Sequence, residues 1–285
     1  MVLKRVIRPT NIRIRLVVGL LLAVMFCIQC TSTDIFSGDM QVMAIADSSA
    51  VVTSPDRMKE LERLGKTDHI GLLRKALENY SNSYQDYTCT FTKQERINGQ
   101  FRDEQVIEVK FLDQPFSVAM RWVKNAPVGD RVLYVEGKHN GQMLVQPKGL
   151  LGALVGTVIR DPDGPDAMAN TRRPVTLFGF KRLMESLLEV YELADSRNEG
   201  KFTFEGYRTK AKKVMVFKRV LPPKKDYPAK TTIWYLDVDY LVPIGLEASD
   251  WDDRQICRYS YSNVKFNTGL TEDEFTPKAN GMKLK

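Results

Sequence analysis

The sequence predicts a single α+β domain in which a wide, curved antiparallel sheet wraps over two helices. Residues 56–285 contain about ten short runs in which apolar and polar side chains alternate, the pattern of strands that bury one face. Two longer stretches, 55–84 and 177–194, instead repeat apolar residues every three or four positions, as amphipathic helices do. Helix, strands, helix and strands follow one another without a solenoid repeat, so both helices are expected in the same domain as the sheet.

The first 30 residues have the composition of an export signal. Five cations and no acid precede residues 16–28, LVVGLLLAVMFCI, an unbroken apolar run. This run is shorter than the ~20 residues that an apolar helix needs to cross a bilayer, so a cleaved signal peptide is favoured and an uncleaved anchor is the alternative. Removing five positive charges from the formal +7 leaves +2, which is not the strongly basic charge of a nucleic-acid-binding domain.

The protein is therefore expected in the periplasm or cell envelope, and no nucleic-acid partner is predicted. Membrane contact would come through the N-terminal segment if that segment stays uncleaved. Residues 31–55 mix small, polar and apolar side chains without a period, which predicts a flexible linker before the domain at 56–285.

The domain is expected to begin with a helix and a hairpin. Residues 55–84 place apolar side chains at helical steps on both sides of Asp68, which has the side chain of an N-cap, and one amphipathic helix is predicted. Residues 86–97 then alternate apolar residues with threonine and end at Asn98-Gly99. This dipeptide is typical of a tight hairpin turn because both residues tolerate positive φ, so a returning strand is expected over 101–112.

Further strands are expected on both sides of the second helix. Before it, alternation predicts strands over 116–122, 131–136 and 142–146. After it, strands are predicted near Lys201 and over 213–221, 231–238, 242–248 and 255–266. The short connections between neighbouring runs indicate an antiparallel meander.

The segment 147–166, PKGLLGALVGTVIRDPDGPD, matches no regular helix or strand pattern. Its glycines lack the GxxxxGK spacing of a phosphate-binding loop, and its aspartates fit only the first positions of a calcium loop. The string Asp-Pro-Asp-Gly-Pro is better explained as consecutive turns. The apolar run 150–159 is expected either to fold onto the core or to act as a flexible lid beside a cavity.

Patterns of catalytic or metal-binding residues are poorly represented. The two histidines, His69 and His139, belong to no HExxH motif, and the chain has no GxSxG motif. Asp237 and Asp239 could lie about 7 Å apart on one strand face as paired carboxylates, although residues 239–243 are more typical of a turn. No catalytic residue, metal site or cofactor is therefore predicted, and a carboxylate-based hydrolase is the third choice of function.

Two cysteines, Cys89 and Cys257, remain after the signal segment. An oxidising compartment would permit a disulfide between them. The sequence leaves open whether their Cβ atoms approach within the ~4.5 Å that a disulfide requires.

Several strings between Tyr87 and Pro277 resemble those of an uncharacterised family of exported bacterial proteins, among them YTCTFTKQER, VLYVEGKHNGQML, DPDGPDAM and YSYSNVKFNTGLTEDEFTP. More distantly, the chain is similar to the superfamily of periplasmic lipoprotein carriers and their sensor relatives (LolA/RseB-like), through Phe91-Thr-Lys-Gln94 and through Leu270 to Phe275. This resemblance implies an unclosed antiparallel half-barrel wrapped over the helices, with an apolar cavity that accepts acyl chains. The early-strand arginine of the carriers has no counterpart here, so lipoprotein transport itself is not expected.

The favoured function is a noncatalytic cell-envelope protein that holds a lipid or an acylated peptide in this cavity. The residues expected to contact the ligand are apolar side chains on strand faces, together with part of the mid-chain run near the mouth: Phe111, Met120, Trp122, Trp234 and Leu236, then Leu150, Leu151, Leu154 and Val155. The alternative is an envelope sensor or interaction module that binds a partner protein through the sheet edge and carries no ligand.

Overall fold

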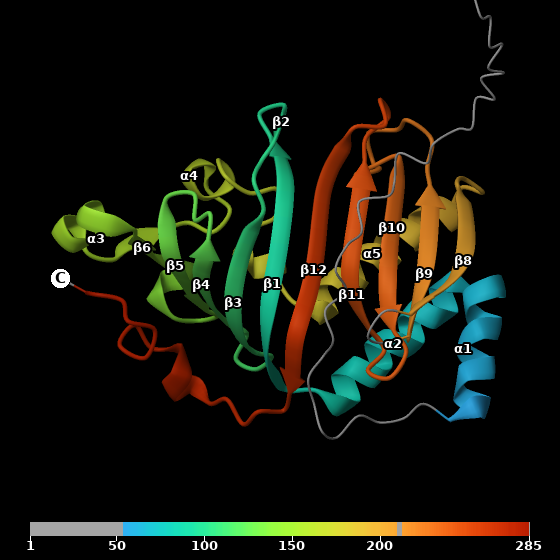
Figure 1. The fold of residues 1–285 in the computed structure, drawn as a ribbon, viewed down its shortest axis with the longest axis horizontal. Coiled ribbons are helices and arrows are strands. Elements are labelled where there is room, and N and C mark those ends of the chain that lie inside the picture. Colours follow the sequence, from blue (N-terminus) through green and yellow to red (C-terminus); the bar gives the residue numbers. More distant parts are fainter. Residues whose placement is uncertain (1–53, 210–212, 285) are drawn as a thin grey trace, which may run out of the picture. The chain divides into compact units, whose positions relative to one another are not determined.

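The computed structural model describes residues 54–209 and 213–284, which form a sheet with helices packed on one of its faces (Figure 1). The expected signal peptide at 1–30 and nearly all of the expected linker at 31–55 lie outside the described residues. None of the helices in the described part of the chain has the length and hydropathy needed to cross a bilayer.

The strands form one antiparallel sheet that does not close, which confirms the predicted fold class. Their order across the sheet is β7 (Val158–Arg160), β6 (Met143–Pro147), β5 (Gly129–Val135), β4 (Ser117–Lys124), β3 (Gln105–Leu112), β1 (Asp86–Ile97), β12 (Gln255–Phe266), β11 (Val242–Ser249), β10 (Thr231–Asp237), β9 (Lys213–Val220) and β8 (Lys201–Thr209). The short strand β2 (Gln100–Phe101) pairs only with the end of β1. The first and last strands, β1 and β12, pair at the centre and join the two halves of the sheet (Figure 1).

Two helices, α1 (Pro55–Thr67) and α2 (His69–Ser83), stand where one was predicted. The backbone of Asp68 has φ −153°, which is not helical, so the chain turns at this residue. Its N–H donates to Leu64 O and ends α1, while its carboxylate accepts from Gly71 N at 2.7 Å and caps α2. The prediction of a single helix was wrong because the N-cap lies inside the periodic stretch and starts a second helix.

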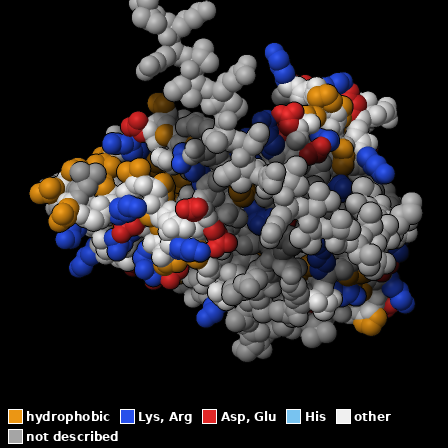
Figure 2. Space-filling model, turned by 45° about the horizontal axis from the view of Figure 1, so that its top comes forward, with side chains coloured by type: hydrophobic (Ala, Val, Ile, Leu, Met, Phe, Trp, Pro, Cys, Tyr) orange, Lys and Arg blue, Asp and Glu red, His pale blue; other side chains and the backbone are white. Residues whose placement is uncertain are grey.

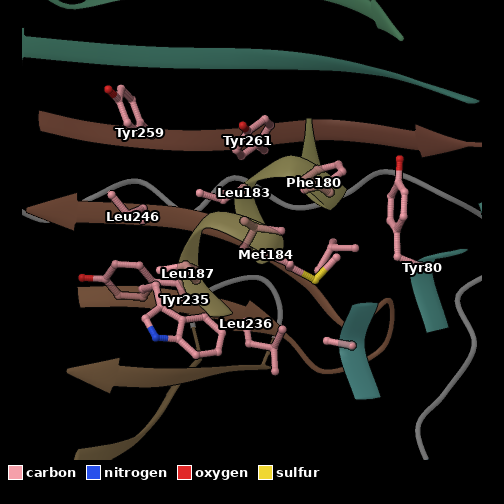
Figure 3. Close-up of a cluster of buried hydrophobic side chains, with 14 of the residues drawn as sticks. Tyr80, Phe180, Leu183, Met184, Leu187, Tyr235, Leu236, Leu246, Tyr259 and Tyr261 are labelled. Carbon is pink, nitrogen blue, oxygen red and sulfur yellow. The ribbon is translucent and has the colours of Figure 1, made fainter. Parts of the chain in front are cut away.

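The inner face of the sheet, defined here as the face on which the helix α5 (Phe180–Ser196) packs, contains the main core. α2 packs against α5, and α5 packs on β11. Figure 3 shows the apolar side chains of α5 next to those of the sheet: Phe180, Leu183, Met184 and Leu187 meet Leu236, Leu246, Tyr259 and Tyr261. Each such side chain contributes about 1.5–3 kcal/mol when it is fully removed from water, so this layer fixes the helices on the sheet.

The outer face of strands β3 to β6 is covered by the C-terminal segment. Phe275, at the end of the 3-10 helix η3 (Glu272–Phe275), and Met282 pack with Leu112, Leu133 and Leu144 in a separate apolar cluster. The chain end therefore buries the apolar part of the outward-facing side chains of these strands. The side chains on the inner face of these strands must be covered by a different part of the chain.

The mid-chain segment is more regular than its sequence indicates. Residues 147–166 include the helix α3 (Gly149–Val155), the edge strand β7 and the start of the short helix α4 (Pro165–Met168). Gly149 has φ +67° and Gly156 has φ +75°, values that glycine adopts without steric cost, so the chain can enter and leave α3 sharply. The prediction that this segment forms no helix or strand was wrong, because a seven-residue helix is too short to establish a period.

His69 lies buried between α1, α2 and the sheet. Its Nε2 atom is 2.6 Å from Gly65 O, and its ring packs edge-on against Phe217 at 5.1 Å between centroids. Burial lowers the pKa of His69 below its ordinary value, because the charged imidazolium would lose hydration. The neutral form is therefore the one that fits the core.

We expect the free energy of unfolding to fall when the pH is lowered through about 6.5, the ordinary histidine pKa. In that range the unfolded chain binds a proton that the folded chain does not, so acid favours unfolding. Urea unfolding at pH 7.5 and 5.0 measures the difference, and His69→Phe should reduce it. His139→Gln, in an exposed turn, is the control and should keep the full difference; equal behaviour of the two variants would refute the assignment to His69.

Candidate functional site

A cavity of about 510 Å³ lies against the inner face of the sheet half that α2 and α5 leave uncovered. One wall comes from β1 and β3 to β7, and the other from residues 160–178, which contain α4 and the 3-10 helix η2 (Val175–Leu177). Most of the wall is apolar, and the strands contribute Phe91, Ile107, Met120, Trp122, Val132, Met143, Val145 and Val158. This volume and lining are within the range of pockets that bind small apolar ligands.

The structure separates the predicted ligand contacts into three groups. Met120, Trp122 and Val155 line the cavity. Leu150 and Leu154 point outward from α3 and are 85% and 72% exposed. The side chain of Leu151 lies outside the described part of the structure.

The other predicted contacts, Phe111, Trp234 and Leu236, lie in the closed core. Phe111 stacks on Tyr87 with ring centroids 4.6 Å apart. Trp234 is fully buried, and its Nε1 donates to the Tyr191 hydroxyl at 3.0 Å. These side chains do not line the cavity, because the helices pack over their part of the inner face.

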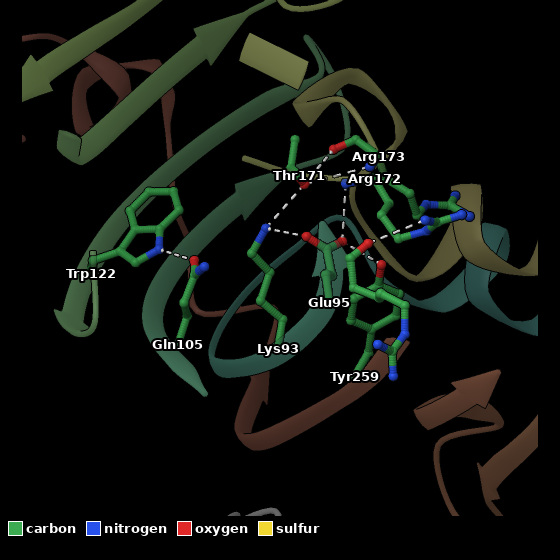
Figure 4. Close-up of polar contacts among 9 residues, drawn as sticks. Lys93, Glu95, Gln105, Trp122, Thr171, Arg172, Arg173 and Tyr259 are labelled. Carbon is green, nitrogen blue, oxygen red and sulfur yellow. Dashed lines mark hydrogen bonds and ion pairs between the residues drawn. The ribbon is translucent and has the colours of Figure 1, made fainter. Parts of the chain in front are cut away.

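A buried polar cluster, formed by Lys93, Glu95, Thr171 and Tyr259, lies in the cavity wall where β1 and β12 meet (Figure 4). Lys93 Nζ is 3.0 Å from Glu95 Oε2 and donates to Thr171 Oγ1 at 3.0 Å. Glu95 Oε1 accepts from the Tyr259 hydroxyl at 2.5 Å and from the backbone N–H of Arg172 at 3.3 Å. The Lys93 and Glu95 side chains are only 10% and 3% exposed, so the ion pair depends on these neighbours for its stability.

Burial also raises the pKa of Tyr259 well above its ordinary value, and the nearby Glu95 carboxylate adds to this shift. The hydroxyl is therefore protonated at neutral pH and can donate to Glu95. On the neighbouring strands, Trp122 Nε1 donates to Gln105 Oε1 at 2.7 Å. Sequence reasoning missed the cluster. The spacing of Lys93 and Glu95 could have indicated it, because residues two apart lie on the same strand face and that face is otherwise apolar.

The charged side chains in the wall leave one net positive charge. Glu95 pairs with Lys93, and Asp166 lies 3.5 Å from Arg160. Arg173 is the fifth charged residue of the wall, and its Nη2 donates to Ser186 Oγ at 3.1 Å and to Leu177 O at 3.4 Å. The cavity therefore combines apolar surface for a hydrocarbon chain with donors for an acidic or uncharged polar head group.

The paired aspartates form a turn. Asp237 is fully buried, and its Oδ1 accepts from the backbone N–H groups of Asp239 at 2.9 Å and Tyr240 at 3.0 Å. This geometry shapes the connection from β10 to β11, in agreement with the turn interpretation. The described residues hold no group of three or more His, Cys, Asp or Glu side chains arranged to bind a metal ion.

The structure contradicts the hypothesis of a disulfide between Cys89 and Cys257, because both cysteines are free and buried. Cys257 lies opposite Glu95 in the register of β1 with β12, six residues along β1 from Cys89. At ~3.3 Å per residue this is about 20 Å, far beyond the reach of a disulfide. Burial raises the pKa of the Cys257 thiol to about 12, so the thiolate that would react is not populated at neutral pH.

Comparison with known proteins assigns the chain to a family. Residues 84–283 match the model of the family described as "Protein of unknown function (DUF1571)". The match covers well over half of the chain, so the chain belongs to this family. No curated protein matches it.

Solved structures with a similar fold include three with low sequence identity to this chain. A chain of the Pseudomonas aeruginosa MucA/MucB complex has 14% identity and a TM-score of 0.44, covering 76% of this chain and 63% of that one. A LolA superfamily protein from Nitrosomonas europaea has 8% identity and a TM-score of 0.31, covering 73% and 98%. The Mycobacterium tuberculosis lipoprotein LppX has 8% identity and a TM-score of 0.40, covering 71% and 96%.

The predicted membership of an uncharacterised family is thereby confirmed. The likeness to a LolA superfamily protein is one of fold alone. The identities are below 25% and the TM-scores below 0.5. These likenesses therefore concern the general fold and say nothing about the function of this chain.

Replacing Glu95 by Gln should destabilise the fold by about 3–5 kcal/mol, because it leaves the Lys93 ammonium buried without its counter-charge. The control is Glu108→Gln, which breaks the pair of Glu108 with Arg121 on the exposed side of the same sheet half, where the side chains are 51% and 54% exposed. That change should cost about 0–1 kcal/mol. Urea unfolding measures both, and equal losses would contradict the structural importance of the buried pair.

Proposed function

We propose that this chain is a noncatalytic, exported cell-envelope protein that holds the hydrocarbon chain of a lipid or an acylated peptide in its cavity. The observation that carries the proposal is the apolar cavity of about 510 Å³ on the uncovered half of the inner face. Removing a chain from water contributes about 0.8 kcal/mol per buried CH₂ group, whereas water gains little from occupying an apolar wall. A hydrocarbon chain is therefore the ligand that the wall favours.

The proposed contacts are the predicted residues that line the cavity, Met120, Trp122 and Val155, with Ile107 and Val132 beside them. The polar end of the ligand would lie near Lys93 and Arg173, which belong to the cavity wall. The N-terminal pattern supports export. The use of Asp237 as a turn residue removes the one carboxylate pair that favoured hydrolysis.

A second candidate is an interaction module that binds an envelope protein without a ligand. Its support is the open edge of the sheet. The nine-residue strand β8 is the last in the strand order, so in the described part of the chain it pairs with β9 on one side and with no strand on the other. Such an edge can accept a strand from another protein. The two candidates differ in what the cavity contains.

Lipid extraction and mass spectrometry of the purified mature protein test the proposal. We expect an acyl-containing species that copurifies with the wild type and is reduced in Met120→Trp, because the larger side chain takes up part of the cavity. The matched control is Arg121→Trp, since Arg121 is the next residue on β4 and points to the opposite face. An empty wild-type cavity would favour the interaction module, and equal lipid content in both variants would place the lipid elsewhere.

A further inference from the structure

Exposed apolar side chains gather at one end of the sheet. Of the eight large apolar side chains exposed in the described part of the chain, six belong to α3, its flanking strands and the chain end, a group called here the α3 patch: Val128, Leu150, Leu154, Val155, Ile159 and Leu284. Figure 2 shows orange side chains collected at the left end, where Figure 1 places α3. Single exposed apolar residues are ordinary, but a concentration of this kind indicates a contact surface.

Local structure holds this patch together. Leu150 and Leu154 are four residues apart on α3 and therefore lie on the same side of the helix. Lys148 N donates to Val128 O at 3.2 Å, which holds Val128 beside the start of α3. Thr157 N donates to Lys283 O at 2.8 Å, so the C-terminal residues run next to β7 and bring Leu284 to the patch.

The stretches of chain that carry the patch have only positive charges. The three stretches that build it, 124–129, 137–160 and 275–284, contain no aspartate or glutamate. They contain basic residues close to the patch, namely Lys148, Arg160 and Lys283, of which Arg160 lies 3.5 Å from Asp166. Apolar side chains that project from a basic surface are the combination that binds an interface of anionic lipids.

We propose that the α3 patch docks on an anionic lipid bilayer, with Leu150 and Leu154 inserted between the head groups. A bilayer fits better than a protein groove, because Leu150 and Leu154 project from the surface and the stretches that carry the patch have only basic charges. The patch is also continuous with the cavity, since Val128 and Val155 belong to both. A bilayer docked here covers that rim of the cavity, so a hydrocarbon chain can pass between membrane and protein with little exposure to water.

The docking of the patch goes beyond the proposed function and does not depend on it, because an empty cavity leaves the patch unchanged. Flotation of the purified protein with phosphatidylcholine vesicles, with and without phosphatidylglycerol, measures docking. We expect binding to the vesicles that contain phosphatidylglycerol, weaker binding to neutral vesicles, and loss of binding at high salt.

The double variant Leu150→Glu/Leu154→Glu should lower the partition onto anionic vesicles by about tenfold or more, since two inserted side chains become charged. Both positions are exposed, so circular dichroism and the unfolding midpoint should match those of the wild type. Val123→Glu is the control: this residue of β4 is 49% exposed and belongs neither to the α3 patch nor to the cavity wall. This control should bind as the wild type does.

Two results would overturn the proposal. One is binding of the double variant at the wild-type level, which would place vesicle contact outside the patch. The other is a wild type that does not float with anionic vesicles but sediments as a dimer that the double variant loses, which would make the patch an interface between two copies. Copurified lipid is measured separately, so failure here and failure of the proposed cargo are distinguishable.

Discussion

The packing of α5 on one half of the sheet is the constraint on which the other features depend. A helix of 17 residues is about 25 Å long and about 10 Å wide with its side chains. The strands from β7 to β8, spaced about 4.8 Å apart, make a surface about 48 Å wide. Even with α2 beside it, α5 covers mainly the inner face from β12 towards β9, so most of the inner face of β3 to β7 requires another cover.

That cover is irregular, and its irregularity leaves the cavity. Residues 160–178 cross the inner face through two short helices and turns, which pack less closely against strands than a long amphipathic helix does. At the border between the filled and the hollow half, Glu95 receives hydrogen bonds from Tyr259 of β12 and from the backbone of Arg172. The polar cluster thus connects the central strands to the covering segment and fixes the inner end of the cavity.

Much of the fold was predictable from the sequence, because alternation and helical periodicity record which face of each element is buried. The bounds of β1 and β12 and the position of α5 follow from this pattern. The pattern does not record what covers that face. Trp122 and Trp234 are both inward-facing strand residues, yet one lines the cavity and the other is sealed under α5. The contacts of Glu95 with Tyr259 and Arg172 join residues that are far apart in the chain, so no local pattern contains them.

The central claim is that the hollow half of the inner face accepts a hydrocarbon chain while the filled half does not. Quenching of tryptophan fluorescence by a dibrominated fatty acid tests it directly, because bromine quenches only at close contact and the chain has three tryptophans. We predict saturable quenching that Trp122→Phe abolishes and Trp251→Phe preserves. Quenching that survives in Trp122→Phe, or a wild type that is not quenched at all, would contradict the account.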